Sequence, residues 1–369
     1  MLFDRIDIFC DVIDNFGDAG VTYRLARALK AELVDSEIRL FTNGLEVFSK
    51  IDCGIDHKVK DQVCGGIRFS SYDILTPGSV EKYEIPELVI EAFACHIPAA
   101  YYEKVLDTDC LIINLDHLSA EKWIEGVHLK ESLTGRKAKK NFFMPGLTSA
   151  SGGIIPDRQL SDGEMAEKRK YFENLYRLES GSFLISVFTY EHDFHHFISN
   201  LNSIGRKVSL IVFGEKSQRS IRKADLENEK LTIKYSDFLP QAEYDGLLKV
   251  CDLNFVRGED SWARACLSKK PFVWHAYHQK DNYQQVKVKA FLEYLMEFYT
   301  DPKLYELYSS YMMKFNDRSG TAADESAGFM LQHAQTLERY NISLSEHLIK
   351  NCNLINNLLF FAGSLKNDK

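Results

Sequence analysis

Short apolar runs, each followed by a segment with helical periodicity, recur along the whole chain. They lie at 6–13, 37–43, 72–78, 87–93, 111–117 and 141–146 in the first half, and at 183–188, 207–214, 231–239, 252–258 and 271–277 in the second. Runs of this length with helices between them are typical of parallel strands that are covered by helices on both faces. The pattern therefore predicts an α/β fold in which we read each run as a strand.

The chain length and one loop-like segment predict two domains. A chain of 369 residues is longer than one ordinary hydrophobic core supports. The stretch 149–164, SASGGIIPDRQLSDGE, is rich in the residues of turns and loops. We expect a Rossmann-like N-terminal domain over 1–163 and a second over 164–345, with a terminal helix at about 346–369 that joins the first. Two doubly wound domains facing across a cleft would bind ligands at the carboxyl ends of their strands.

Charge and hydropathy exclude some classes of function. The net charge of -8 argues against a general nucleic-acid binder, because such proteins carry a basic surface. Charged residues interrupt the N-terminal segment, so it does not resemble a signal peptide, and no apolar run approaches the roughly 20 residues that cross a membrane. The eight cysteines form no CxxC pair, which favours reduced thiols. We expect a cytoplasmic protein that binds neither nucleic acid nor membrane.

The stretch VIDNFGDAG, at 12–20, joins the first predicted strand to a helix over 21–30. Turns of this kind usually present backbone N–H groups to a phosphate, but Asp14 and Asp18 oppose an anion here. The spacing of Gly17 and Gly20 is also not that of a dinucleotide-binding turn. Two interpretations stay open. The aspartates cap the helix and form a turn, or they face a cleft and handle a cation or a proton. No third ligand lies nearby in sequence to support a metal site.

A second distinctive stretch, NFVRGEDSWARACLSKKPFVWHAY, lies at 254–277. The predicted strand ends in the stretch Arg-Gly-Glu-Asp-Ser, and the helix after it begins at about Ser261 or Trp262. Backbone amides, the Ser261 hydroxyl and the Arg257 guanidinium could therefore together hold a diphosphate. The alternative is an ordinary helix start beside a surface ion pair. Two other strand ends, at 186–192 and 238–241, carry aromatic residues that either stack on a nucleobase or belong to the core.

These motifs together resemble those of a known family, the arginine rhamnosyltransferases that modify translation elongation factor P. The matching segments are 8–29, 90–98, 113–126, 142–153, 238–241 and 255–277. DNFGD with RLAR, followed by RGEDS with KPFVWH, is a specific combination that is not expected to match by chance. The chain departs from the family pattern at Tyr23, which replaces tryptophan, at 116–117, where Asp-His replaces Glu-Tyr, and at 277–279, where Tyr-His-Gln replaces Tyr-Pro-Gln.

The resemblance implies the GT-B glycosyltransferase architecture and an inverting reaction. The implied donor is dTDP-β-L-rhamnose, and the acceptor is an arginine side chain of folded elongation factor P; no metal or other cofactor is implied. By motif, Asp18 corresponds to the general base and Asp14 to a second required carboxylate, and Glu259 is placed with these catalytic residues. The implied donor-binding residues are Phe188, Tyr190, Phe238, Gln241, Arg257, Asp260 and Ser261, with the backbone of Asn15, Phe16 and Gly17 near the donor.

The chemistry of the implied acceptor explains why a glycine turn carries carboxylates. An arginine guanidinium has a pKa above about 12 and no free lone pair, so it must be oriented and deprotonated before it attacks. One carboxylate orients the guanidinium and the other takes the proton. An ordinary aspartate, with a pKa of about 3.9, is a weak base for this purpose, so we expect late proton transfer. Glu259 cannot neutralise a leaving phosphate and is expected to orient a hydroxyl or stabilise positive charge on the sugar ring; Asp260 contacts the donor or caps its helix.

Two other functions remain open on the sequence alone. One is a GT-B glycosyltransferase that uses a different nucleotide sugar or a small-molecule acceptor. The other is a non-enzymatic α/β module whose acidic turn binds a basic partner.

Overall fold

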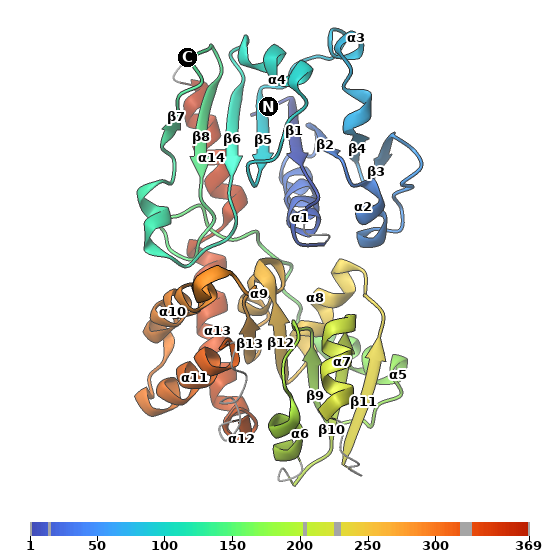
Figure 1. Cartoon of the computed structure of the whole chain (residues 1–369), viewed down its shortest axis with the longest axis vertical. Helices are drawn as coiled ribbons and strands as arrows, with labels where there is room; N and C mark the ends of the chain where they lie inside the picture. The colour runs from blue at the N-terminus through green and yellow to red at the C-terminus, as the bar shows by residue number, and fades with distance from the viewer. Residues whose placement is uncertain (1, 14–15, 202–204, 225–229, 318–326, 368–369) are drawn as a thin grey trace. The chain divides into compact units, whose positions relative to one another are not determined.

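The computed structural model describes residues 2–13, 16–201, 205–224, 230–317 and 327–367. Contacts divide the chain into two units, Met1–Pro156 with Lys350–Lys369, and Asp157–Ile349 (Figure 1). The division after Pro156 lies a few residues before the expected break after 163, and the C-terminal segment returns to the first unit. Among the described helices, none has the length and apolar character needed to span a membrane.

The first unit is built on a mixed sheet with the strand order β3-β4-β2-β1-β5-β6-β8-β7. All neighbouring strands are parallel except the two edge pairs, β3 with β4 and β7 with β8. The strands are β1 (Arg5–Cys10), β2 (Glu37–Thr42), β3 (Asp61–Cys64), β4 (Ile67–Ser71), β5 (Leu88–Ala92), β6 (Leu111–Leu115), β7 (Glu131–Ser132) and β8 (Lys139–Phe143). Because β1 pairs with both β2 and β5, the strand order reverses at β1 and makes a switch point at its carboxyl end.

Helices cover both faces of this sheet, as a parallel sheet requires. They are α1 (Phe16–Glu32), α2 (Leu45–Ile51), α3 (Pro77–Val80), α4 (Ala99–Leu106) and α14 (Leu354–Asn367). Successive residues of β1 point to opposite faces, so Ile8 packs with α1 and α14 while Phe9 packs with α4. Asp7 is fully buried on the Phe9 side, where the Arg39 guanidinium and the Tyr101 hydroxyl both donate to its carboxylate. A buried carboxylate is tolerated there because Arg39 supplies an opposite charge and Tyr101 a further hydrogen bond.

The second unit has a fully parallel sheet with the order β11-β10-β9-β12-β13. Its strands are β9 (Phe183–Val187), β10 (Val208–Phe213), β11 (Leu231–Ser236), β12 (Leu253–Arg257) and β13 (Phe272–His275). Its helices are α5 (Asp162–Leu175), α6 (His195–Leu201), α7 (Glu215–Ala224), α8 (Gln241–Val250), α9 (Gly258–Leu267), α10 (Tyr283–Leu295), α11 (Pro302–Phe315) and α12 (Ala327–Gln332), with α13 (Ala334–Asn351) crossing into the first unit. The order reverses at β9, so the second switch point lies between β9 and β12. The prediction of two doubly wound α/β sheets is confirmed.

Two predicted elements are wrong in detail. The run at 72–78 is not a strand but a short 3-10 helix, Tyr72–Ile74, followed by α3, because Ser71 and Thr76 cap two helical turns there. The predicted terminal helix is interrupted between α13 and α14. The backbone of Ile154 bonds to Cys352 and Leu354 on either side of Asn353, so these residues add a bridge to the loop instead of continuing a helix.

Candidate active site

The first group of predicted residues lies at the carboxyl end of β1. Phe16, Gly17 and Asp18 form the first turn of α1, where the helix dipole favours a negative charge. The Asp18 side chain is half-buried, and its backbone carbonyl accepts a 2.8 Å hydrogen bond from the hydroxyl of Thr22. Asp14 and Asn15 lie outside the described residues, so their predicted roles stay predictions. The fold thus puts one carboxylate, Asp18, at the switch point of the first sheet.

Neighbouring strand ends fix the segment that leads to Asp18. The backbone N–H of His96, after β5, donates a 2.8 Å bond to the Asp11 carboxylate, and Asn43, after β2, accepts a 2.8 Å bond from the N–H of Val12. Burial raises the pKa of the nearby Cys10 thiol to about 12, with Asp18 and Asp11 adding to the effect. This thiol therefore stays protonated and is not a nucleophile at neutral pH.

The second group lies at the carboxyl ends of β9 and β12 in the second unit. The Arg257 guanidinium carbon is 4.1 Å from the centre of the Phe188 ring and 5.0 Å from the centre of the Tyr190 ring. Its Nη1 donates a 3.1 Å bond to the carbonyl of Thr189, between those two aromatic residues. Phe188 and Tyr190 are two positions apart in sequence, and Arg257 is far from both. The three side chains therefore form one cluster, in which the planar guanidinium lies against two aromatic rings.

The helix after β12 begins at Gly258. Arg257 is the N-cap residue of α9, and its side chain makes no cap hydrogen bond. Gly258 has a φ of 64°, and a Cβ there would lie 3.5 Å from the Tyr190 hydroxyl. Ser261 is buried in the same turn. This end of α9, with Arg257 beside it, has the features of an anion-binding helix terminus.

The two acidic residues of this turn differ in their surroundings. Glu259 Oε1 lies 3.4 Å from the Nζ of Lys287 on α10, which fixes its carboxylate. Asp260 is half-buried in the first turn of α9 but is not the N-cap residue.

Aromatic residues gather beside Arg257. Phe238 is 50% exposed, and its ring meets the Phe188 ring edge-to-face at 5.8 Å. Tyr244 of α8 meets Phe188 from another side at 5.9 Å. Gln241 is the first residue of α8, three positions after Phe238. The structure therefore brings Phe188, Tyr190, Phe238 and Arg257 together, while Gln241 lies at the start of the adjoining helix.

One residue of this cluster was missed by the sequence analysis. His275, at the end of β13, is paired with Arg257 in the sheet register, and its ring meets the Tyr190 ring edge-to-face at 5.3 Å. Burial lowers the pKa of His275 well below its ordinary value, so its imidazole is neutral. The motif KPFVWHAY marked this segment, but only the strand register shows that His275 lies beside Arg257.

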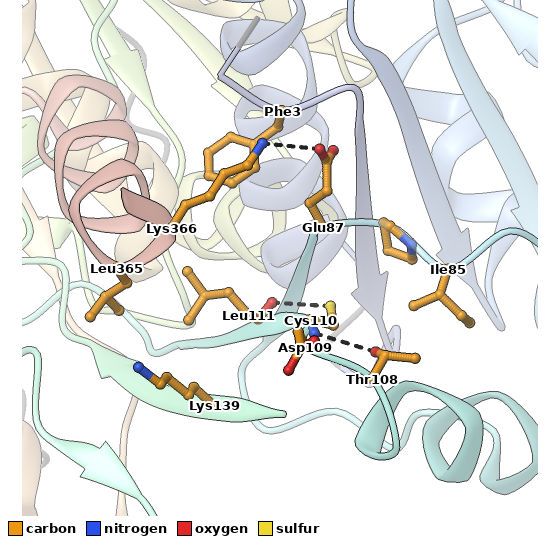
Figure 2. Close-up of a pocket in the computed structure, with 11 residues that line it drawn as sticks. Phe3, Ile85, Glu87, Thr108, Asp109, Cys110, Leu111, Lys139, Leu365 and Lys366 are labelled. Carbon is orange, nitrogen blue, oxygen red and sulfur yellow. Dashed lines mark hydrogen bonds and ion pairs between the residues drawn. The ribbon is translucent and has the colours of Figure 1, made fainter. Parts of the chain in front are cut away.

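The described residues contain no cluster of three or more histidine, cysteine or acidic side chains placed to hold a metal. Figure 2 shows a cavity of about 460 Å³ in the first unit, lined by Leu111, Lys139 and Leu365 and by an ion pair in which Lys366 Nζ lies 3.0 Å from Glu87 Oε1. The cavity lies at the amino ends of β5, β6 and β8, whereas Asp18 lies at the carboxyl end of β1. It is therefore separate from both groups of predicted residues.

Comparisons with known proteins agree with this arrangement. A sequence model of the family described as elongation factor P rhamnosyltransferase EarP matches residues 6–363. A protein-arginine rhamnosyltransferase of Pseudomonas putida is 33% identical over 353 residues, covering 89% of this chain and 92% of the relative. A protein-arginine rhamnosyltransferase of Shewanella oneidensis is 31% identical over 380 residues, covering 92% of this chain and 91% of the relative.

Solved structures show the same fold. A structure that describes EarP-mediated arginine glycosylation of elongation factor P is 21% identical, with a TM-score of 0.60 over 97% of this chain and 98% of the other. A UGT transferase of Siraitia grosvenorii in complex with UDP is 9% identical, with a TM-score of 0.59 over 98% and 99%. The fold is therefore the GT-B glycosyltransferase fold. With a family match that spans nearly its whole length, the chain belongs to the elongation factor P rhamnosyltransferase family, EarP.

Proposed function

We propose that this protein is an inverting glycosyltransferase that moves L-rhamnose from dTDP-β-L-rhamnose to an arginine side chain of translation elongation factor P. The observation that carries the proposal is the position of Asp18, at the switch point of the first sheet, in a chain that matches the family over residues 6–363. The protein would work in the cytoplasm, where translation factors act.

The second unit supplies the groups that a nucleoside diphosphate sugar needs. Arg257 and the N–H groups of the first turn of α9 would bind the diphosphate, assisted by the Ser261 hydroxyl. The half-exposed Phe238 ring, held by Phe188, would stack on the thymine base, with Tyr190 and Gln241 completing the donor contacts.

The first unit supplies the base. We propose that Asp18 receives the proton of the attacking guanidinium nitrogen and that Asp14 orients the guanidinium through charge-assisted hydrogen bonds. Because attack on the sugar carbon acidifies that nitrogen, a carboxylate of ordinary basicity suffices if the proton leaves late. The backbone of Asn15, Phe16 and Gly17 would then contact the donor through its shape and would supply no charge.

A single displacement accounts for inversion. The nitrogen attacks the anomeric carbon on one face while the bond to the diphosphate breaks on the other. Negative charge grows on the leaving phosphate, and Arg257 with the α9 amides would stabilise it, so no metal ion is required. Glu259, oriented by Lys287, would bind a sugar hydroxyl or stabilise positive charge on the ring, and Asp260 would adjoin the donor.

Intact-mass analysis of elongation factor P tests the proposal. After incubation with this protein and dTDP-β-L-rhamnose, the factor is expected to gain one deoxyhexose, which peptide fragmentation places on an arginine. A factor whose target arginine is replaced by lysine should gain nothing. Absence of any gain with dTDP-rhamnose, together with a gain from another nucleotide sugar, would instead assign a different donor.

The metal-free proposal has its own test. Transfer is expected to continue at an unchanged rate in excess chelator, because Arg257 and backbone amides take the place of a cation. Loss of activity that a divalent ion restores would contradict it.

A further inference from the structure

Two aromatic side chains at the carboxyl edge of the first sheet form a parallel stack. The Phe93 and His117 rings follow neighbouring strands, β5 and β6, and their centres are 4.2 Å apart with an angle of 8° between the planes. Phe93 is half-buried and His117 is exposed, so the outer part of the stack is accessible within this unit. A stacked, accessible pair of flat rings is a surface that planar groups recognise.

The backbone holds Phe93 in an unusual conformation. Phe93 and Ala94 both have positive φ angles, 57° and 51°, a region that residues other than glycine rarely adopt. The N–H of Phe93 donates a 2.7 Å bond to the carbonyl of Leu115 at the end of β6, which ties the two ring-bearing segments together. Phe93 and Ala94, two successive residues in the left-handed region, lie at a strand end. Strained backbone conformations of this kind are found most often at functional sites.

The same segment is attached to the strand that leads to Asp18. The Cys95 thiol donates to the carbonyl of Phe9 at 3.2 Å, and the N–H of His96 donates to the Asp11 carboxylate. Phe93 therefore follows the strand next to β1, and His117 follows the second strand from β1, at the same edge of the sheet as the β1–α1 turn. On its other side, Asp116 receives a 2.7 Å bond from the N–H of His117 and so places a half-buried carboxylate next to the exposed ring.

We infer that the Phe93–His117 stack is the platform on which the guanidinium plane of the acceptor arginine lies while Asp18 acts on it. The inference rests on the proposed function and adds to it two residues that determine acceptor specificity. A guanidinium is flat, weakly hydrated and cationic, so it stacks on aromatic rings, and nearby carboxylates bind its edge. A lysine ammonium has no plane to stack, so the platform selects arginine over lysine.

The test replaces the rings without altering the carboxylates. In His117→Ala and in Phe93→Leu, kcat/KM for elongation factor P is expected to fall about tenfold, because the guanidinium loses its stacking partner. The KM for dTDP-rhamnose should stay within about twofold, because the donor groups lie in the second unit. His117→Phe, which keeps a flat ring, should restore kcat/KM to within about threefold of the unaltered protein.

Matched controls lie in the same unit. His57→Ala removes an exposed histidine before β3, and Phe360→Leu removes the ring of a phenylalanine that is 82% exposed on α14. Both should leave kcat/KM unchanged. Unaltered kcat/KM in His117→Ala and Phe93→Leu, or equal loss in His117→Phe, would overturn the platform while rhamnose transfer by the unaltered protein continues. If the unaltered protein transfers no rhamnose, the proposed function fails and the platform fails with it.

Discussion

Arg257 combines two properties that suit a leaving-group site, a fixed plane and a permanent charge. Its guanidinium lies against Phe188 and Tyr190 and is anchored to the carbonyl of Thr189. A lysine has neither the plane nor the several donors needed for this geometry. The residue that follows, Gly258, lets the chain turn into α9 beside the Tyr190 hydroxyl.

We predict that Arg257→Ala weakens dTDP binding about 10- to 100-fold, the loss typical of a charge-assisted hydrogen bond. Arg257→Lys should recover little of it. Isothermal titration calorimetry with dTDP measures both. Arg206→Ala is the matched control, since Arg206 also lies over an aromatic ring, Phe183, at 4.0 Å, but at the amino end of β9. Equal dTDP affinity in Arg257→Ala and the unaltered protein would remove Arg257 from the donor site.

Asp18 is the residue on which the proposed proton transfer depends. Asp18→Asn keeps the size of the side chain and its place in the first turn of α1, so dTDP-rhamnose should bind as before. The rate of transfer to elongation factor P should fall by a factor of about 10²–10⁴, the usual contribution of a general base. Single-turnover kinetics with saturating donor measures it. The control, Asp35→Asn, alters an exposed aspartate beyond the end of α1. A rate within threefold of the unaltered protein would exclude Asp18 as the base.

The sequence could predict which strand ends carry chemistry, but not which side chains touch. Parallel strands place their carboxyl ends on one edge, and the family resemblance assigned Phe188 and Arg257, which both follow such strands, to donor binding. The contacts of His275 and the Phe93–His117 stack depend on sheet register and on positive φ angles, which no local pattern of residue types reports. The roles of all these site residues remain predictions, and Asp14 and Asn15 also lie outside the described residues.

At the scale of elements, capping residues decided one boundary and a tertiary bridge decided another, and periodicity alone predicted neither. The apolar run at 72–78 has the composition of a strand, but Ser71 and Thr76 cap helical turns within it. The terminal helix pattern continues through Cys352, but the bridge from Ile154 interrupts it. Tertiary hydrogen bonds overrode local preference in the second case, whereas a recognisable Thr-x-x-Ser cap was the signal missed in the first.

The start of α5 offers a test of this capping. Ser161 accepts from the N–H of Glu164, and the Glu164 carboxylate accepts in return from the N–H of Ser161. We predict that Ser161→Ala lowers the free energy of unfolding by about 1 kcal/mol, because the N–H of Glu164 loses its side-chain acceptor and the Glu164 carboxylate loses the Ser161 hydroxyl. Urea denaturation followed by circular dichroism measures the change. In the control, Ser343→Ala, an exposed serine inside α13 is replaced, and stability should stay equal or rise slightly. Equal stability in Ser161→Ala would mean that the cap contributes nothing.

At the scale of the whole molecule, the two units share one type of sheet topology. The sheet order reverses once, at β1 in the first unit and at β9 in the second, and the predicted functional residues follow those strands or their neighbours. Each unit also has a partly buried, neutral histidine close to its carboxyl edge, His128 in the first and His192 in the second. Nδ1 of His128 accepts a 3.1 Å bond from the N–H of Met144, and His192 packs between Phe194, Phe315 and His275.

These histidines make the stability of the molecule depend on pH. Burial lowers the pKa of His128 and of His192 to about 4, below the value of about 6.5 in an unfolded chain. Between pH 6.5 and 4 the unfolded chain therefore binds more protons, and the free energy of unfolding falls as the pH falls through that window. Between pH 7 and pH 5, above the range in which most carboxylates titrate, we predict a loss of about 2 kcal/mol from His192 alone. Urea denaturation at the two pH values measures the loss, and His192→Gln, which cannot be protonated, should reduce it by that amount. His57→Ala, at an exposed site, should not. A loss of the same size in His192→Gln and the unaltered protein would show that the His192 imidazole is not the group that takes up the proton on unfolding.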